Sequence, residues 1–145
     1  MNPAFCIREF VENDYPEMIL LWENLGLGGV HRGDDLPIIF RTVKMGGQLL
    51  VMVEKASGSI VGTSWITMDG RRTYLHHFGI KVDYQGKGLA KIMLDASLKL
   101  AKTFGMQIKL EVHKNNMKAL DLYTKAGFTY LGDYQTYIIR DISFI

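Results

Sequence analysis

The segment Ile80-Lys81-Val82-Asp83-Tyr84-Gln85-Gly86-Lys87-Gly88-Leu89-Ala90 decides the interpretation of this chain. It begins as a β-strand, passes two glycines, and continues into apolar positions that recur at helical spacing as far as Phe104. A strand that turns directly into a helix presents unpaired N–H groups at the positive end of the helix dipole. Glycines let an anion approach the backbone, and Lys87 adds a cation. The segment therefore predicts a diphosphate site, with a tight turn that simply needs glycine as the alternative.

Two better-known phosphate motifs do not fit the same residues. A P-loop needs Ser or Thr directly after Gly-Lys, but Gly88 follows Lys87. The dinucleotide-binding fingerprint needs Gly or Ala where Lys91 stands.

The rest of the chain alternates between helical and strand patterns and contains no repeat, linker or low-complexity tract. The apolar spacing and turn residues predict a mixed α/β domain that spans residues 1–145, with one strand-helix-strand unit at its centre. The expected elements are a strand at 5–11, a helix capped by Asn13-Asp14, a glycine-rich loop at 25–33, a helix capped by Asp34-Asp35, strands at 49–54, 60–68 and 73–82, a helix at 89–104, a strand at 108–112, a helix from Asn115 or Asn116 to Gly127, and β structure within 128–142.

Composition excludes several classes of protein. The chain has 145 residues, a formal net charge of +2 and one cysteine, so it predicts neither a disulfide framework nor the basic face of a nucleic-acid binder. The four histidines are scattered, and no Cys/His spacing typical of zinc is present, so no metal is expected. The apolar runs are far too short to cross a membrane, and residues 1–10 lack a secretory pattern, so a cytoplasmic protein is predicted.

Two motifs in the right order resemble the GCN5-related N-acetyltransferase family. Gln85, Gly88 and Ala90 fit the family signature of Gln or Arg, two residues, Gly, one residue, then Gly or Ala. The downstream segment 110–128 is similar to the family's strand-loop-helix pattern, with Asn116, Ala119, Leu122-Tyr123, Lys125 and Gly127-Phe128 at the matching positions. The resemblance covers roughly residues 49–128 and weakens at both ends.

The resemblance implies a GNAT fold, in which a central mixed β-sheet splays between two parallel strands and helices cover both faces. It implies acetyl-CoA as cosubstrate, bound where strands 73–82 and 108–112 separate, with direct transfer of the acetyl group to a primary amine. The residues it assigns to acetyl-CoA are Phe78, Gly79, Ile80, Gln85, Gly86, Lys87, Gly88, Leu89, Ala90 and Asn116.

The resemblance makes Tyr123 the residue that assists the leaving thiolate. On the predicted helix, Tyr123 lies on nearly the same face as Asn116, about 10 Å further along the axis. Reference pKa values near 10 for tyrosine and 8.5 for a thiol make full proton transfer uphill by about 2 kcal/mol, so we expect Tyr123 chiefly to donate a hydrogen bond. A satisfied core tyrosine is the alternative interpretation.

The general base is open between three residues. Glu111 is the first candidate, because a glutamate at this place in Leu-Glu-Val resembles the base of the ribosomal-protein alanine acetyltransferases. His77 and then His76 follow; neighbours on a strand point to opposite faces, so only one of them is expected to face the cleft. Many family members carry an acidic residue where this chain has Tyr74. Cys6 is interpreted as a small buried hydrophobe, which disfavours a ping-pong route.

The acceptor cannot be read from the residues. The reason is that segments 25–45 and 130–145, which would shape its pocket, match the family least. A small-molecule amine or a peptide N-terminus is therefore expected as the acceptor. Tyr130, Tyr134 and Tyr137 either wall the acceptor side or form a homodimer contact. Arg71-Arg72 is a solvated turn rather than a nucleic-acid surface. The alternative function, from another class, is a catalytically silent module of the same fold that senses acyl-CoA or binds another protein.

Overall fold

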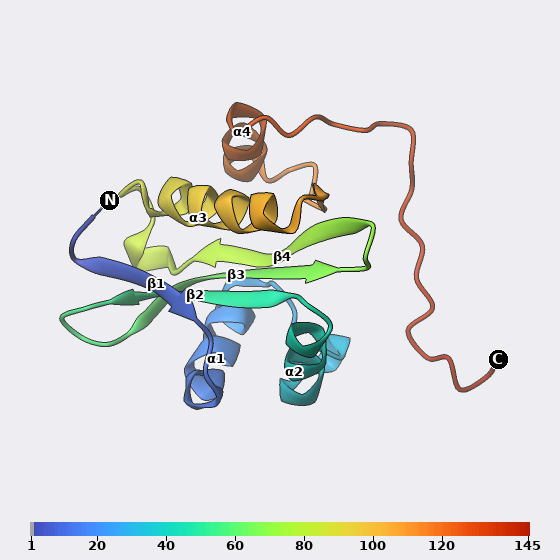
Figure 1. Cartoon of the computed structure of the whole chain (residues 1–145), viewed down its shortest axis with the longest axis horizontal. Helices are drawn as coiled ribbons and strands as arrows, with labels where there is room; N and C mark the ends of the chain where they lie inside the picture. Colours follow the sequence, from blue (N-terminus) through green and yellow to red (C-terminus); the bar gives the residue numbers. More distant parts are fainter. Residues whose placement is uncertain (1) are drawn as a thin grey trace. The chain divides into compact units, whose positions relative to one another are not determined.

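This computed structural model describes residues 2–145, and a single mixed sheet organises those that lie before residue 112. Its strands lie in the order β1-β2-β3-β4-β5, antiparallel from β1 to β4 and parallel between β4 and β5 (Figure 1). The expected antiparallel meander and the expected parallel pair at 73–82 and 108–112 are both confirmed. The strands are β1 (Phe5–Glu9), β2 (Gln48–Glu54), β3 (Ile60–Met68), β4 (Arg72–Ile80) and β5 (Gln107–Leu110).

Helices cover both faces of the sheet. The helices α1 (Tyr15–Leu25) and α2 (Leu36–Lys44) lie on one face, and α3 (Leu89–Phe104) lies on the other (Figure 1). α3 has the bounds that its apolar spacing predicts, and it ends at Gly105 in the left-handed conformation. Asp35 caps α2 by accepting a hydrogen bond from the Ile38 amide at 3.1 Å. Short 3-10 turns complete this part of the chain: η1 (Glu12–Asp14), η2 (Val30–Arg32) and η3 (Val82–Tyr84).

The expected side-chain cap of α1 is wrong in one respect. Asp14 occupies the N-cap position, but its carboxylate does not bond to the helix amides. It accepts instead from the Val11 amide at 2.9 Å and from the Arg8 guanidinium at 2.7 and 2.9 Å, which lowers the pKa of the Asp14 carboxyl below its usual value. The fork geometry of arginine outcompetes the helix amides for this side chain.

The two faces of the sheet have separate cores. On the α1 and α2 face, two stacked tryptophans, Trp22 and Trp65, lie at the centre with ring centroids 5.7 Å apart. Around them pack the buried residues Met18, Leu21, Ile39, Leu49, Val51, Val53 and Ile60. On the α3 face the buried residues are Phe5, Leu50, Met52, Val61, Ile80, Leu89 and Met93.

The chain divides into two compact units, one that ends at Glu111 and one that comprises Val112–Ile145. The second unit contains α4 (Met117–Lys125). Asn116 is the N-cap of α4, and its side-chain oxygen accepts a hydrogen bond from the Ala119 amide at 3.2 Å. At the other end the Phe128 amide donates to the Tyr123 carbonyl at 3.0 Å, so the helix ends where Gly127 predicts.

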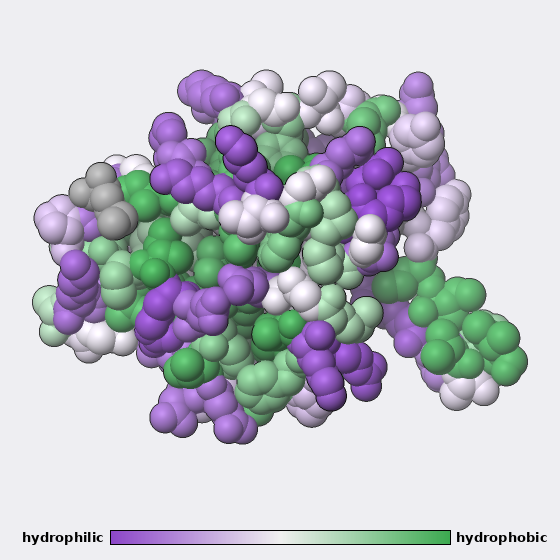
Figure 2. Space-filling view, viewed as in Figure 1, coloured by the Kyte–Doolittle hydropathy of each residue, from purple (hydrophilic) through white to green (hydrophobic). Residues whose placement is uncertain are grey.

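The expected β structure within 128–142 is wrong. This segment contains no strand among the described residues, although its composition favours one. High β-propensity stabilises a strand only when its N–H and C=O groups find a partner strand, and propensity does not name that partner. Its apolar side chains are correspondingly exposed, many of them visible as green atoms in Figure 2. They are Tyr130, Leu131, Tyr134, Tyr137, Ile138, Ile139, Ile142, Phe144 and Ile145.

Within residues 2–145, no helix is both long and apolar enough to cross a membrane. The same residues hold no group of three or more His, Cys, Asp or Glu side chains that could bind a metal ion.

Candidate active site

The parallel strands β4 and β5 separate after a short stretch of pairing. Their register runs from Arg72 opposite Gln107 to Leu75 opposite Leu110, where β5 ends. β4 continues to Ile80 and remains paired on its other side with β3, through Gly79 opposite Thr63 and Ile80 opposite Gly62. The splay between the two strands that the resemblance implies is therefore present.

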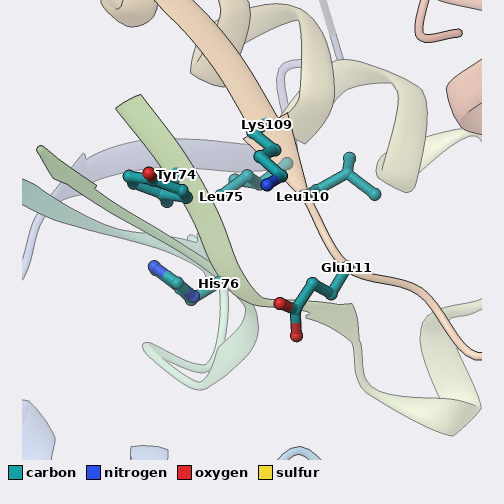
Figure 3. Close-up of a pocket in the computed structure, with 6 residues that line it drawn as sticks. All are labelled: Tyr74, Leu75, His76, Lys109, Leu110 and Glu111. Atoms are coloured by element: carbon teal, nitrogen blue, oxygen red, sulfur yellow. The ribbon is translucent and has the colours of Figure 1, made fainter. Parts of the chain in front are cut away.

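A small pocket of about 80 Å³ opens at this point of separation (Figure 3). It is lined from β4 and from the end of β5 by Tyr74, Leu75, His76, Lys109, Leu110 and Glu111. Because Tyr74 lies opposite Lys109 and Leu75 opposite Leu110, His76 and Glu111 are the next residues on their strands. The pocket thus combines an imidazole, a carboxylate and an ammonium group with a phenol ring.

An extra residue in β4 puts His76 and His77 on the same face of the sheet. The register shifts between Thr63 and Trp65, so that two steps along β3 correspond to three along β4, from His76 to Gly79. His77 absorbs the extra residue with a φ of 44°. Both imidazole rings then contact Trp65, at centroid distances of 6.3 Å and 5.2 Å. The expectation that the two histidines point to opposite faces is therefore wrong, because regular alternation fails at a bulge.

His77 is enclosed by the α1 face of the core. Its ring lies 4.3 Å from Trp22, centroid to centroid, and its Nε2 atom is buried 3.1 Å from the Asp34 Oδ2 atom. These two atoms are close but are not aligned as a hydrogen bond. Asp34, expected only as part of a helix cap, is thus held against β4.

Two linked hydrogen bonds support the β-bulge at His77. The Trp22 Nε1 atom donates to the Thr63 hydroxyl at 2.8 Å, and this hydroxyl donates to the His77 carbonyl at 2.7 Å. Thr63 is fully buried, so its oxygen must find both partners inside the protein.

The glycine segment between β4 and α3 has the conformation of an anion-binding loop. Gly86 and Gly88 have φ values of 77° and 78°, which side chains with a Cβ rarely adopt. Gln85 closes the loop, since its Nε2 donates to the Ile80 carbonyl at 2.8 Å and its amide donates to the Val82 carbonyl at 3.1 Å. The Lys87 ammonium lies 5.2 Å from the centre of the Tyr84 ring.

At the start of α3 the side chain and the backbone of Leu89 have different roles. Leu89 is buried in the core under α3, so only its backbone faces the loop. The first amides of α3 have no partner within the helix and are donors for an anion. The residues present fit a diphosphate group.

The model of the acetyltransferase (GNAT) family matches residues 15–128. The chain belongs to this family. The match begins well before residue 49, the point from which the two motifs carry the resemblance, and it includes α1 and α2. The expected fold class is therefore confirmed as the GNAT fold.

Solved GNAT structures share this fold over most of their length. A GNAT acetyltransferase from Staphylococcus aureus Mu50 superposes with a TM-score of 0.77 at 21% identity, covering 91% of this chain and 90% of that one. Glucosamine-6-phosphate N-acetyltransferase from Arabidopsis thaliana gives 0.75 at 19% identity, covering 94% and 99%. Ard1 from Thermoplasma volcanium gives 0.74 at 22% identity, covering 87% and 83%. At these identities the similarity establishes the fold.

The second unit holds the remaining GNAT motif residues, Asn116 and Tyr123. The Tyr123 ring is buried and packs edge-on against Phe128, with centroids 5.6 Å apart. Burial raises the pKa of Tyr123 to about 12, so its hydroxyl keeps its proton at neutral pH. The Asn116 oxygen is used as the helix cap, which leaves its NH₂ group as the donor toward a ligand.

Several residues of the site escaped the sequence analysis. Three features depend on contacts between segments that are distant in the sequence. They are the stacking of Trp22 on Trp65, the contact of Asp34 with His77, and the position of Lys109 in the pocket. The doublet His76-His77 was visible, but a bulge has no signature in a single sequence.

We expect Thr63→Val to destabilise the protein by about 1–3 kcal/mol, because the Trp22 indole N–H would be buried without an acceptor. Thr63→Ser is the matched control, since it keeps the hydroxyl. The measurement is urea denaturation of both variants and the wild type. Equal losses for Val and Ser would show that the hydroxyl does not support the bulge.

Proposed function

We propose that this GNAT protein transfers the acetyl group of acetyl-CoA directly to a primary amine. The observation that carries the proposal is the separation of β4 and β5 next to the glycine loop that begins α3. The first feature opens an edge for an extended ligand, and the second offers donors to a diphosphate. The small pocket at the separation point provides polar groups that can receive an amine.

The proposed binding residues act mainly through their backbone. Phe78, Gly79 and Ile80 lie on the part of β4 beyond its pairing with β5, where a pantetheine arm would add like a strand. It would use backbone groups other than the Ile80 carbonyl, which already accepts from Gln85. The amides of the segment Gly86–Ala90 would hold the diphosphate, with Lys87 as the nearby cation.

Gln85 and Asn116 support the same ligand in different ways. Both the amide and the side chain of Gln85 already bond within the loop, so Gln85 maintains the loop conformation. The NH₂ group of Asn116 is the donor proposed for the pantetheine arm.

Acetyl-CoA supplies the acyl group as an activated thioester. The protein must provide a neutral amine and a donor for the leaving thiolate. Glu111 lies at the pocket mouth, where its carboxylate attracts an ammonium group, and His77 stands as a further candidate base on the same face. Tyr123, which keeps its proton, is proposed as the hydrogen-bond donor to the thiolate.

The first experiment is to measure free-thiol release from acetyl-CoA with a panel of small amines and peptide N-termini, against an acceptor-free control. Acceptor-dependent release with a matching acetylated product supports the transferase and defines its substrate class. Binding of acetyl-CoA without release across the panel would favour a sensing module instead.

We expect Gly88→Ala to weaken acetyl-CoA binding, because it removes the left-handed residue that places the loop amides. Gly105→Ala is a matched control: Gly105 has a φ of 68° at the other end of α3, and neither glycine has an atom within 4 Å of an added Cβ. Both substitutions should cost about 1–2 kcal/mol of stability. Calorimetric titration should show weaker binding for Gly88→Ala alone, and equal binding would contradict the loop assignment.

We expect Tyr123→Phe to lower kcat on the order of 10²-fold while acetyl-CoA binding is kept, because the phenyl ring preserves packing and removes only the donor. Tyr15→Phe on α1 serves as the tyrosine control. The measurement is steady-state kinetics combined with a direct binding assay. Wild-type turnover in Tyr123→Phe would exclude the proposed role.

A further inference from the structure

We propose that His76 is the residue that takes the proton from the acceptor ammonium, while the Glu111 carboxylate holds that ammonium in place. The inference rests on the proposed acetyl transfer and assigns the base that the sequence left open. It narrows the choice between the two histidines that the bulge brings to one face.

The geometry of the pocket favours His76. Its side chain is exposed at the pocket, one strand step beyond the last parallel pair, and Glu111 occupies the corresponding place after β5. Figure 3 shows the carboxylate of Glu111 on the side of the strands from which the His76 ring projects. An amine that reached this point would therefore meet a carboxylate and an imidazole together.

Hydrogen bonding leaves one nitrogen of His76 available. The Nε2 atom lies 2.8 Å from the Thr67 hydroxyl. If Nε2–H donates to this oxygen, the Nδ1 atom carries the lone pair that can accept a proton. The Tyr74 ring stacks on His76 at an interplanar angle of 21°, and Trp65 meets it edge-on, so the imidazole is held between two aromatic rings.

His77 is less suited to the task. Its Nε2 atom is buried beside Asp34, and its ring lies between Trp22 and Trp65. An amine could reach this nitrogen only by displacing the loop that carries Asp34. We therefore assign His77 to the support of the bulge.

The surroundings of His76 favour its neutral form. Desolvation lowers the pKa of His76 below its usual value, and repulsion from His77 lowers it further, whereas the carboxylates of Asp34 and Glu111 oppose this shift. Lys109 and Tyr74 complete the titratable groups that line the pocket with it. A neutral imidazole is the form that can accept a proton at neutral pH.

During acetyl transfer the acceptor nitrogen loses two protons and the thiolate gains one. The ammonium gives one proton to His76 Nδ1, which passes it to solvent at the pocket mouth. The freed nitrogen lone pair forms the bond to the acetyl carbon, and the carbon–sulfur bond breaks. The nitrogen then loses its second proton, and the thiolate sulfur gains one. The products are the amide, the free thiol and one proton released to solvent.

The test is the pH dependence of kcat/KM for the wild type and for His76→Gln, with two acceptors whose amine pKa values differ. For the wild type we expect activity to rise with pH through an ionisation below 6.5 that stays in place when the acceptor is changed. In His76→Gln this ionisation should disappear and kcat should fall by about 10²-fold or more. Added imidazole should restore part of the activity of His76→Ala.

Two further variants separate catalysis from structure. His77→Gln should lower the unfolding temperature, whereas His76→Gln should leave it nearly unchanged, since His76 is exposed. His31→Gln, on the exposed turn η2, is the histidine control and should keep the wild-type pH profile. An unchanged acidic limb and kcat in His76→Gln would overturn the inference. Absence of acceptor-dependent release in the wild type would instead contradict the proposed acetyl transfer.

Discussion

The extra residue in β4 is the constraint on which the candidate active site depends. A strand that gains one residue must absorb it in an unfavourable backbone conformation, here the positive φ of His77. The cost of such a conformation is of order 1–3 kcal/mol, and the protein offsets it by ring contacts with Trp22 and Trp65 and by the hydrogen bond from Thr63. The result is a strand that turns two consecutive side chains to one face at the point where its pairing with β5 ends.

The separation of roles within the site follows from this arrangement. The groups proposed to hold acetyl-CoA are mainly backbone amides and carbonyls, which only chain conformation can place. The groups proposed to act on the amine are side chains, His76 and Glu111, at the end of the paired region. Between them, buried side chains such as Thr63 and His77 hold the backbone in shape. Chemistry and support are thus carried by neighbouring residues on β3, on β4 and at the end of β5.

The sequence predicted the parts of this design that depend on local signals. Helix α3 follows from its apolar spacing and its two glycines, and the parallel pair follows from the family motifs. Two expectations failed for one physical reason. They are the strand expected within 128–142 and the opposite orientation of His76 and His77. Pairing partners decide where strands form and where they bulge, and neither propensity nor alternation names those partners. The contact between Asp34 and His77 could not be predicted either, because it joins a loop to a strand more than forty residues away.

The stacked tryptophans give the protein a built-in optical reporter. They are the only two tryptophans in the sequence, they lie nearly parallel at 9°, and both touch the His77 ring. Both indoles absorb in the near ultraviolet and are packed in a fixed orientation, so the pair should contribute strongly to the circular dichroism of this chain. Any ligand that displaced the bulge or the Asp34 loop would change their relative angle. Binding of such a ligand could therefore be followed by spectroscopy in the unmodified, unlabelled protein.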